Sequence, residues 1–258
     1  MGIEREESKP IGWHSMTFAH RARRFLRRFG IDVSRYPDQS VGGQLARLLR
    51  HHEIDLVVDV GASTGDYVRE LRAGGYRGRV VSFEPLPQAL PSLRQRAAAD
   101  GSWEVIGCAL GPEDGPVVLN VAGNAGASSS VLGMLPRHAR AAPESSYVGQ
   151  VLVEQRRLDA LWPDVAGDAQ HVFLKIDVQG YEERVLKGAI RSLAACAGLQ
   201  IEVSLVPLYE AGFDLDGGLR LAEQHGFQLE ALVPGFTDPT TGQLLQTDLV
   251  LFRADADA

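Results

Sequence analysis

The run DVGASTGDY, residues 59–67, places two glycines and two acids directly after an apolar stretch. Glycine allows a sharp turn and lets a ligand approach the backbone closely. In open α/β sheets, ligands bind at turns that follow the carboxyl ends of strands. The dinucleotide fingerprint GxGxxG is absent, because Ser63 and Asp66 stand where its second and third glycines belong. We therefore predict a loop for a zwitterionic cofactor tail rather than a pyrophosphate, with a plain strand–helix turn as the alternative.

A second acid follows the next apolar stretch, in the run Phe83-Glu84-Pro85. A carboxylate at the end of a strand in such a sheet can accept hydrogen bonds from both hydroxyls of a ribose. Folds that bind NAD use the same device, so Glu84 alone does not choose between cofactors. Together with the loop 59–67, Glu84 predicts a cofactor that contains adenosine.

The run KIDVQGYE, residues 175–182, places further acids after a later apolar stretch. Asp177 closes that stretch and should face the same crevice as the glycine loop. Glu182 falls in the first turn of the following helix, where a negative charge also stabilises the helix N-terminus. Glu202 lies inside an otherwise apolar strand, where a carboxylate needs a partner, so a structural ion pair and an active-site role both stay open.

The stretch 123–149 is rich in glycine, alanine and serine, and we expect a long loop that covers the crevice. The candidate acceptor-binding residues are Ser129, Ser130, Glu182 and Glu202. His138 is the first candidate for a general base, because imidazole titrates near neutral pH, and Asp177 is the second. A metal-assisted variant also stays open, with Asp177 and Glu202 as oxygen ligands for Mg²⁺.

Short apolar runs alternate with helical patterns from residue 55 onward, which predicts a parallel sheet with helices on both faces. The predicted strands are 55–60, 79–83, 103–108, 117–121, 151–157, 172–176, 199–203, 227–233 and 247–252. The predicted helices are 41–52, 66–73, 87–99, 182–195 and 216–225. The connection 234–242 is too short for a crossover helix, so the final strand should run antiparallel to its predecessor.

Such a doubly wound, mostly parallel sheet with an antiparallel final strand is typical of the Rossmann-like class I methyltransferases. It predicts an α/β methyltransferase domain over residues 53–258 and an N-terminal helical extension, residues 1–52, packed on this core. Within the extension, residues 18–29 form an amphipathic pattern with an arginine-rich face. The simplest interpretation is a helix whose arginines lie in water, and the alternative is a contact with an anionic acceptor or a membrane surface.

The composition excludes several classes of protein. The chain has 258 residues and a net charge of −7, and this acidity argues against a dedicated nucleic-acid binder. Cys108 and Cys196 belong to no CxxC or Cys/His cluster, so we expect reduced, buried thiols and no structural zinc. The N-terminus lacks the pattern of a secretory signal and no apolar run reaches the length of a transmembrane helix. We therefore expect a cytoplasmic protein, whose assembly into a homo-oligomer the sequence leaves open.

The chain resembles the FkbM family of S-adenosylmethionine-dependent methyltransferases over residues 55–252. The resemblance is carried by DVGASTGDY (59–67), SFEP (82–85), CALG (108–111), SSSVL (128–132), RRLDAL (156–161) and KIDVQGYEERVLKGA (175–189). The segment KIDVQGYE is the most specific of these runs, since the glycine loop is shared by many methyltransferases. The arginine-rich segment 18–29 is not covered.

The resemblance implies O-methylation of a hydroxyl on a sugar, glycan or polyketide-type natural product. The residues implied to hold the cofactor are Asp59, Gly61, Ala62, Gly65 and Glu84, with Ser63 and Pro85 of the same two motifs. The adenine would lie near Cys108 and Ala109, and Asp177 beside the methionine end or the acceptor.

Three alternatives stay open beside this interpretation. A nicotinamide-dependent oxidoreductase could use the same type of sheet, although the altered glycine fingerprint and the KIDVQGYE segment count against it. A binding module without catalysis could keep the fold and serve in assembly. Methylation of nucleic acid is suggested by the arginine-rich segment alone, and the acidic net charge counts against it.

Overall fold

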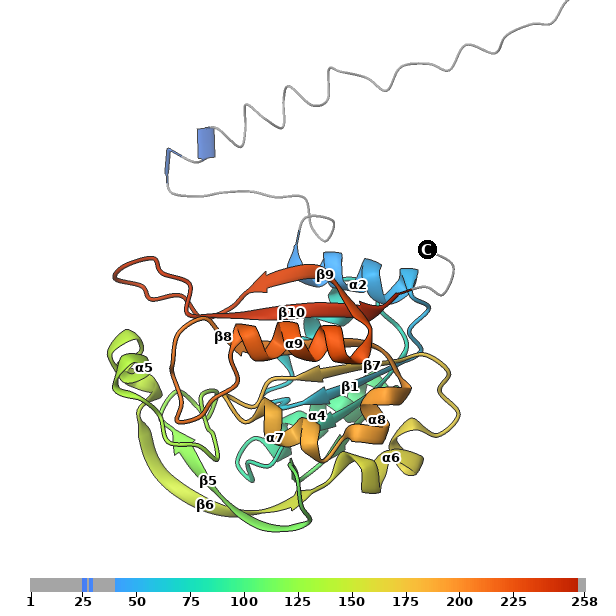
Figure 1. Cartoon of the computed structure of the whole chain (residues 1–258), viewed down its shortest axis with the longest axis horizontal. Helices are drawn as coiled ribbons and strands as arrows, with labels where there is room; N and C mark the ends of the chain where they lie inside the picture. The colour runs from blue at the N-terminus through green and yellow to red at the C-terminus, as the bar shows by residue number, and fades with distance from the viewer. Residues whose placement is uncertain (1–24, 27, 30–39, 255–258) are drawn as a thin grey trace, which may run out of the picture.

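The computed structural model describes residues 25–26, 28–29 and 40–254. Its centre is a seven-stranded sheet in the order β3-β2-β1-β7-β8-β10-β9 (Figure 1). The strands are β1 Leu56–Val60, β2 Arg79–Phe83, β3 Trp103–Ile106, β7 Val172–Ile176, β8 Cys196–Ser204, β9 Phe227–Pro234 and β10 Gln246–Arg253. β10 is antiparallel to both β8 and β9, while β1, β2, β3, β7 and β8 pair in parallel. The predicted doubly wound sheet with an antiparallel final strand is thus confirmed.

Helices cover both faces of this sheet, which explains why β1 and β7 are buried along their whole length and are apolar except for Asp59 and Lys175. The helices are α2 Val41–His51, α3 Asp66–Ala73, α4 Leu90–Asp100, α6 Leu158–Ala166, α7 Glu182–Lys187, α8 Ile190–Ala195 and α9 Leu215–His225. Apolar side chains of α2, α3 and α4 share one core cluster, and those of α6 to α9 share another. Figure 1 shows α7, α8 and α9 together in front of the sheet.

A second, three-stranded sheet in the order β4-β6-β5 lies beside the first and was not predicted as a separate unit. Its strands are β4 Ala109–Leu110, β5 Gly115–Ala122 and β6 Tyr147–Arg156. β5 and β6 pair antiparallel with each other, so the expected strands 117–121 and 151–157 leave the main sheet. The two long, curved strands run along one end of the molecule (Figure 1).

Several predicted elements have different bounds in the structure. The expected helix 182–195 is two helices, α7 and α8, and the helix α6 was not predicted. The stretch 123–149, expected as one long loop, contains α5 Pro136–Ala141 and the 3-10 turn η1 Pro143–Ser145. Their prolines at the first turn favour helix starts within an otherwise loop-like composition.

In the predicted extension 1–52, the continuous described part begins at residue 40. The side chain of Ser40 accepts a hydrogen bond from the backbone N–H of Gly43 and caps α2. Leu45, Ala46 and Leu49 of α2 are buried in the same cluster as α3 and α4. Most of the predicted arginine-rich helix 18–29 lies outside the described residues. In the described part of the chain, every helix is too short or too polar to cross a membrane.

Candidate active site

A pocket opens at the carboxyl ends of β1, β2 and β7. It is lined by residues that follow these strands, by residues 108–110, and by the segment 126–131 beside the second sheet. The chain leaves β1 toward β2 on one side, while β7 flanks β1 on the other. This reversal of strand order separates the loops and creates a crevice, which is where open α/β sheets bind ligands.

The loop after β1 depends on Gly61. Its φ angle of +84° lies in the left-handed region, and a Cβ at this position would lie 1.9 Å from the carbonyl oxygen of Asp177. The missing side chain therefore lets the ends of β1 and β7 approach each other. Ser63 also has a positive φ angle, +47°, which turns its backbone N–H toward Glu84.

Glu84 is held at the pocket by two backbone donors. One carboxylate oxygen accepts a hydrogen bond of 2.7 Å from the N–H of Ser63, and the other accepts one of 2.7 Å from Leu86. Burial raises the pKa of Glu84, and these two hydrogen bonds oppose the rise. Each oxygen keeps a second lone pair, so the fixed carboxylate can still accept hydrogen bonds from a ligand.

Beneath the pocket, polar side chains on three neighbouring strands form one connected row. Asp59 stands opposite Ser82 of β2 and Lys175 of β7 in the strand register. The Ser82 hydroxyl donates to Asp59 at 2.8 Å, and the Lys175 ammonium lies 3.1 Å from the other Asp59 oxygen. The indole N–H of Trp103 donates to Ser82 at 2.9 Å. One Asp59 oxygen therefore accepts a hydrogen bond, and the other, which has no hydrogen-bond partner, lies beside the Lys175 cation.

Lys175 carries the positive charge of this region. Its ammonium also lies 3.6 Å from Asp177 Oδ2 and donates to the carbonyl of Gly61 at 3.3 Å. Burial alone would lower the pKa of Lys175, but the Asp59 and Asp177 carboxylates outweigh burial and raise it above its usual value. One buried cation thus links the ends of β1 and β7.

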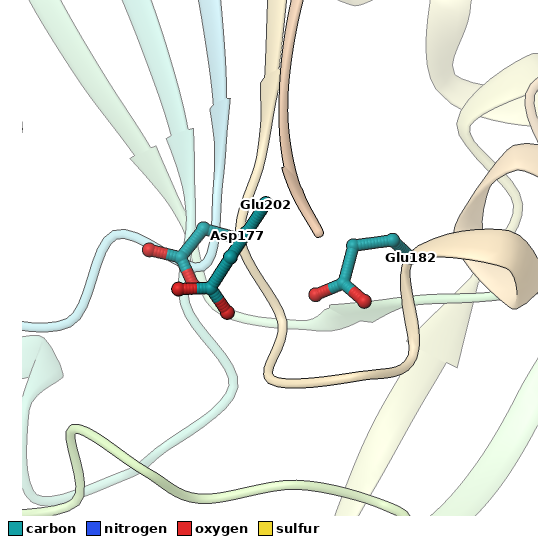
Figure 2. Close-up of side chains that lie close together, drawn as sticks. All are labelled: Asp177, Glu182 and Glu202. Carbon is teal, nitrogen blue, oxygen red and sulfur yellow. The ribbon is translucent and has the colours of Figure 1, made fainter. Parts of the chain in front are cut away.

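Asp177 meets Glu202 and Glu182 on the other side of the pocket. Figure 2 shows the three side chains converging from the end of β7, from β8 and from the start of α7. One carboxylate oxygen from each lies within 4.8 Å of the others. The side-chain amide of Gln179 donates to Asp177 at 2.8 Å and to Glu202 at 3.0 Å, so it lies between these two carboxyl groups.

The two glutamates of this acidic cluster (Asp177, Glu182 and Glu202) are buried. Burial, reinforced by Asp177 and other nearby acids, raises the pKa of Glu202 well above its usual value. Burial also raises the pKa of Glu182 to about 8, against hydrogen bonds from backbone N–H groups that include those of Val178 and Gly180. A proton held among these carboxyl groups limits the negative charge behind the pocket.

A comparison of the sequence with models of protein families decides to which family the chain belongs. The profile of the methyltransferase FkbM domain matches residues 59–229, which include the glycine loop, Glu84 and the acidic cluster. The chain belongs to the FkbM methyltransferase family. No curated protein is close enough in sequence to count as a relative.

Solved structures of methyltransferases resemble this FkbM chain more distantly. Methyltransferase FkbM from Methylobacillus flagellatus KT shares 21% identity at a TM-score of 0.47, over 78% of this chain and 44% of that one. This chain therefore spans less than half of the Methylobacillus protein. Precorrin-6y C5,15-methyltransferase from Geobacter metallireducens GS-15 shares 15% identity at a TM-score of 0.43, over 86% of this chain and 94% of that one. Fibrillarin from Aeropyrum pernix, solved with S-adenosyl-L-methionine, shares 10% identity at a TM-score of 0.43, over 76% of this chain and 66% of that one.

The structure of this FkbM domain brings about half of the predicted site residues to the pocket. Those that line it are Gly61, Ser63, Glu84, Pro85, Cys108, Ala109, Ser129 and Asp177. Asp59, Ala62, Ser130, His138, Glu182 and Glu202 are buried outside that lining, and Gly65 caps α3 in a left-handed conformation. Asp59 was expected to contact the cofactor, but its ion pair with Lys175 holds it beneath the pocket surface.

The sequence suggested His138 as the general base, but the structure places His138 outside the pocket lining. It lies on α5 with 2% of its surface exposed, and it packs against the rings of Tyr209 and Phe236 at centroid distances of 5.1 Å each. Burial lowers the pKa of His138, and its Nδ1 has no hydrogen-bond partner. The aromatic packing of α5 thus separates this imidazole from the pocket lining.

Lys175, Gln179 and Tyr209 are polar residues of the site that were not singled out from the sequence. Gln179 lines the pocket and bridges Asp177 and Glu202, and the Tyr209 hydroxyl donates to the Gln179 side-chain oxygen at 2.8 Å. Gln179 stands inside the KIDVQGYE run, where a polar residue just after a strand end was the available signal. Tyr209 carried no local signal, because only the fold places it beside Gln179.

Proposed function

We propose that this FkbM domain transfers a methyl group from S-adenosylmethionine to a hydroxyl group of a sugar, glycan or natural-product acceptor. One observation carries the proposal. The Glu84 carboxylate, fixed by two backbone N–H groups, and the Asp177 carboxylate line one pocket from the ends of β2 and β7, on opposite sides of β1. The Glu84 carboxylate suits the two hydroxyls of a ribose, and the Asp177 carboxylate suits an acceptor hydroxyl that must lose its proton.

The pocket residues fit the proposed cofactor. Glu84 keeps free lone pairs for the ribose, and the buried side chains of Phe83, Cys108 and Leu110 offer an apolar surface to an adenine. Gly61 and Asp177 both line the pocket, and the methionine end of the cofactor would lie beside them. When bound, S-adenosylmethionine supplies an activated methyl group on a sulfonium centre.

The chain's own contribution is positioning and proton removal. Asp177 would accept the proton of the acceptor hydroxyl, and the bound cofactor would supply the methyl group that replaces this proton on the oxygen. A positioned base of this kind contributes on the order of 10²–10⁴-fold to the rate. Asp177 is the stronger candidate of the two predicted bases, since it lines the pocket whereas His138 of α5 is buried outside the lining. Ser129 also lines the pocket and is a candidate acceptor contact.

Metal assistance by Asp177 and Glu202 would need a change in this arrangement. The Gln179 amide nitrogen donates to both carboxylates, at 2.8 and 3.0 Å, and stands where an ion that bridges them would bind. An amide nitrogen that carries protons is no ligand for Mg²⁺. We therefore propose that transfer proceeds without Mg²⁺.

The test is transfer of labelled methyl from S-adenosylmethionine to a panel of sugars, glycosides and oligosaccharides, with Mg²⁺ and with EDTA. We expect label on a hydroxyl at equal rates in both conditions. Activity that EDTA abolishes would instead make the acidic cluster a metal site. Label on nitrogen or carbon alone would contradict O-methylation.

Cofactor choice is tested separately by calorimetry with S-adenosylmethionine and with NAD. We expect the protein to bind S-adenosylmethionine and not NAD. Binding of NAD alone would favour the oxidoreductase, while S-adenosylmethionine binding without turnover on any acceptor would favour the binding module. The matched control is Asp177→Asn, which keeps the shape of the side chain and should bind the cofactor but lose transfer.

A further inference from the structure

Gln179 makes a complete set of hydrogen bonds in the site. Its Nε2 donates to Asp177 Oδ1 at 2.8 Å and to Glu202 Oε2 at 3.0 Å. Its Oε1 accepts from the hydroxyl of Tyr209 at 2.8 Å. An ionised carboxylate only accepts hydrogen bonds, so a flipped amide would lose its contact with Asp177. The amide is therefore held in one orientation.

The backbone at Gln179 is held as firmly as the side chain. Its φ angle of +57° lies in the left-handed region, which is unfavourable for a residue with a Cβ. The Ser130 hydroxyl donates to the Gln179 carbonyl at 2.7 Å. The next residue, Gly180, also has a positive φ, and a Cβ there would lie 2.9 Å from the Cβ of Tyr209. Strained backbone that its surroundings maintain is typical of functional sites.

Tyr209 is suited to hold this arrangement. It is 2% exposed, and burial raises the pKa of its hydroxyl, so the hydroxyl stays protonated and remains a donor. The ring of His138 packs against it at 5.1 Å, which limits its movement. Tyr209 belongs to the loop after β8, so it ties that loop to the end of β7.

We propose that Gln179 is a positioning residue that aims the Asp177 carboxylate at the acceptor, and that Tyr209 positions Gln179. This inference rests on the proposed function, because Asp177 is the base of that reaction. Without the Gln179 donor, Asp177 keeps only the more distant Lys175 contact of 3.6 Å. Its carboxylate then rotates away from the line of proton transfer, and small displacements of reacting groups cost large factors in rate.

The first test compares Gln179→Met, Tyr209→Phe and a matched control, Tyr76→Phe, in the full-length protein. Tyr76 is also buried, but its hydroxyl donates to the carbonyl of Arg79, away from the pocket. We expect Gln179→Met to lower kcat about 10–100-fold and Tyr209→Phe about 3–10-fold. The dissociation constant of S-adenosylmethionine should change less than about threefold, and Tyr76→Phe should change neither quantity.

The pH profile distinguishes positioning from a general loss of structure. Removing a donor to Asp177 favours its protonated form, so the acidic limb of the kcat profile should move to higher pH in Gln179→Met. Unchanged kcat and an unchanged acidic limb in Gln179→Met would overturn the proposal. If Gln179→Met fails to bind the cofactor, Tyr209→Phe carries the same test with a smaller change.

A second test needs no turnover, and so separates failure of this inference from failure of the proposed function. Nuclear magnetic resonance follows the exchange of the Gln179 side-chain amide protons with water. We expect slow exchange in the parent protein, at least about tenfold faster exchange in Tyr209→Phe, and no change in Tyr76→Phe. Exchange as fast as that of a free amide in the parent protein would overturn the proposed role of Tyr209.

Discussion

The two walls of the pocket are built from different kinds of contact. At the ends of β1 and β2, Glu84 is held by the backbone N–H groups of Ser63 and Leu86. At the ends of β7 and β8, Asp177 and Glu202 are held by side chains, that of Gln179 for both and that of Gln246 for Glu202. Backbone donors persist through most substitutions, whereas each side-chain donor depends on one residue. Single substitutions should therefore disturb the second wall more than the first.

The walls also differ in how they balance charge. Beneath the first, Asp59 is paired with the Lys175 cation at 3.1 Å. Behind the second, burial raises the pKa of Glu202 and Glu182, so protonation reduces the negative charge there. An ion pair between Lys and Asp persists over a wide pH range, while protonated carboxyl groups lose their protons as the pH rises. The second wall should therefore be the pH-sensitive one.

Lys175→Met should have the largest effect, because Lys175 serves both walls. The variant leaves Asp59, which is fully buried, without its cation. We expect the free energy of unfolding to fall by about 3–5 kcal/mol, as measured by urea denaturation. The double variant Asp59→Asn with Lys175→Met removes the uncompensated charge and should recover much of this loss. Equal stability of the single and double variants would contradict the pairing.

Glu84→Gln should weaken the binding of S-adenosylmethionine at the first wall without unfolding the protein. The substitution keeps the size of the side chain but replaces one acceptor oxygen with an NH₂ group, which faces a backbone N–H of Ser63 or Leu86. Hydrogen bonds to charged groups contribute about 1.5–3 kcal/mol, so the dissociation constant of S-adenosylmethionine should rise about 10–100-fold. Calorimetry measures this, with Glu104→Gln of β3 as a surface control. An unchanged constant would remove Glu84 from the binding site.

Glu182→Gln should change how stability depends on pH. The folded-state pKa of Glu182 is about 8, above its ordinary value of 4.5, so the folded state binds the extra proton between these values. The stability that this proton contributes is complete below about pH 4.5 and is lost as the pH rises through about 8. The variant should flatten this decline by at most about 1.4 kcal/mol per pH unit. Urea unfolding between pH 5 and 9 measures it, and parallel curves for both proteins would contradict the buried proton.

His138→Phe should have the smallest effect, since His138 lies in neither wall. Phenylalanine keeps the aromatic packing on Tyr209, and we expect stability at pH 8 to change by less than about 1.5 kcal/mol and kcat by less than about threefold. Burial lowers the pKa of His138, so its neutral form stabilises the fold above the ordinary pKa of 6.5, and this contribution is lost as the pH falls below it. The variant should therefore resist acid better than the parent. A large loss of kcat with unchanged cofactor binding would instead support His138 as the general base.

Local patterns in the sequence were enough to predict the main sheet, the glycine loop and Glu84. Apolar runs such as Leu56–Val60 and the short connection after β9 act over a few residues, so spacing alone constrains them. The FkbM family follows from the same runs. The second sheet was missed because the pairing of β5 with β6 depends on a hairpin whose tip contains α5.

Only the tertiary structure decided which polar groups meet. The strand register places Lys175 beside Asp59 and so withdraws Asp59 from the pocket. The packing of α5 buries His138, and the left-handed turn after β7 carries Gln179 between Asp177 and Glu202. Such contacts join residues far apart in the chain, and their energies depend on distances of a few ångströms. Periodicity and composition act along the chain, so the sequence determined the binding frame, while folding in three dimensions determined the placement of the charges.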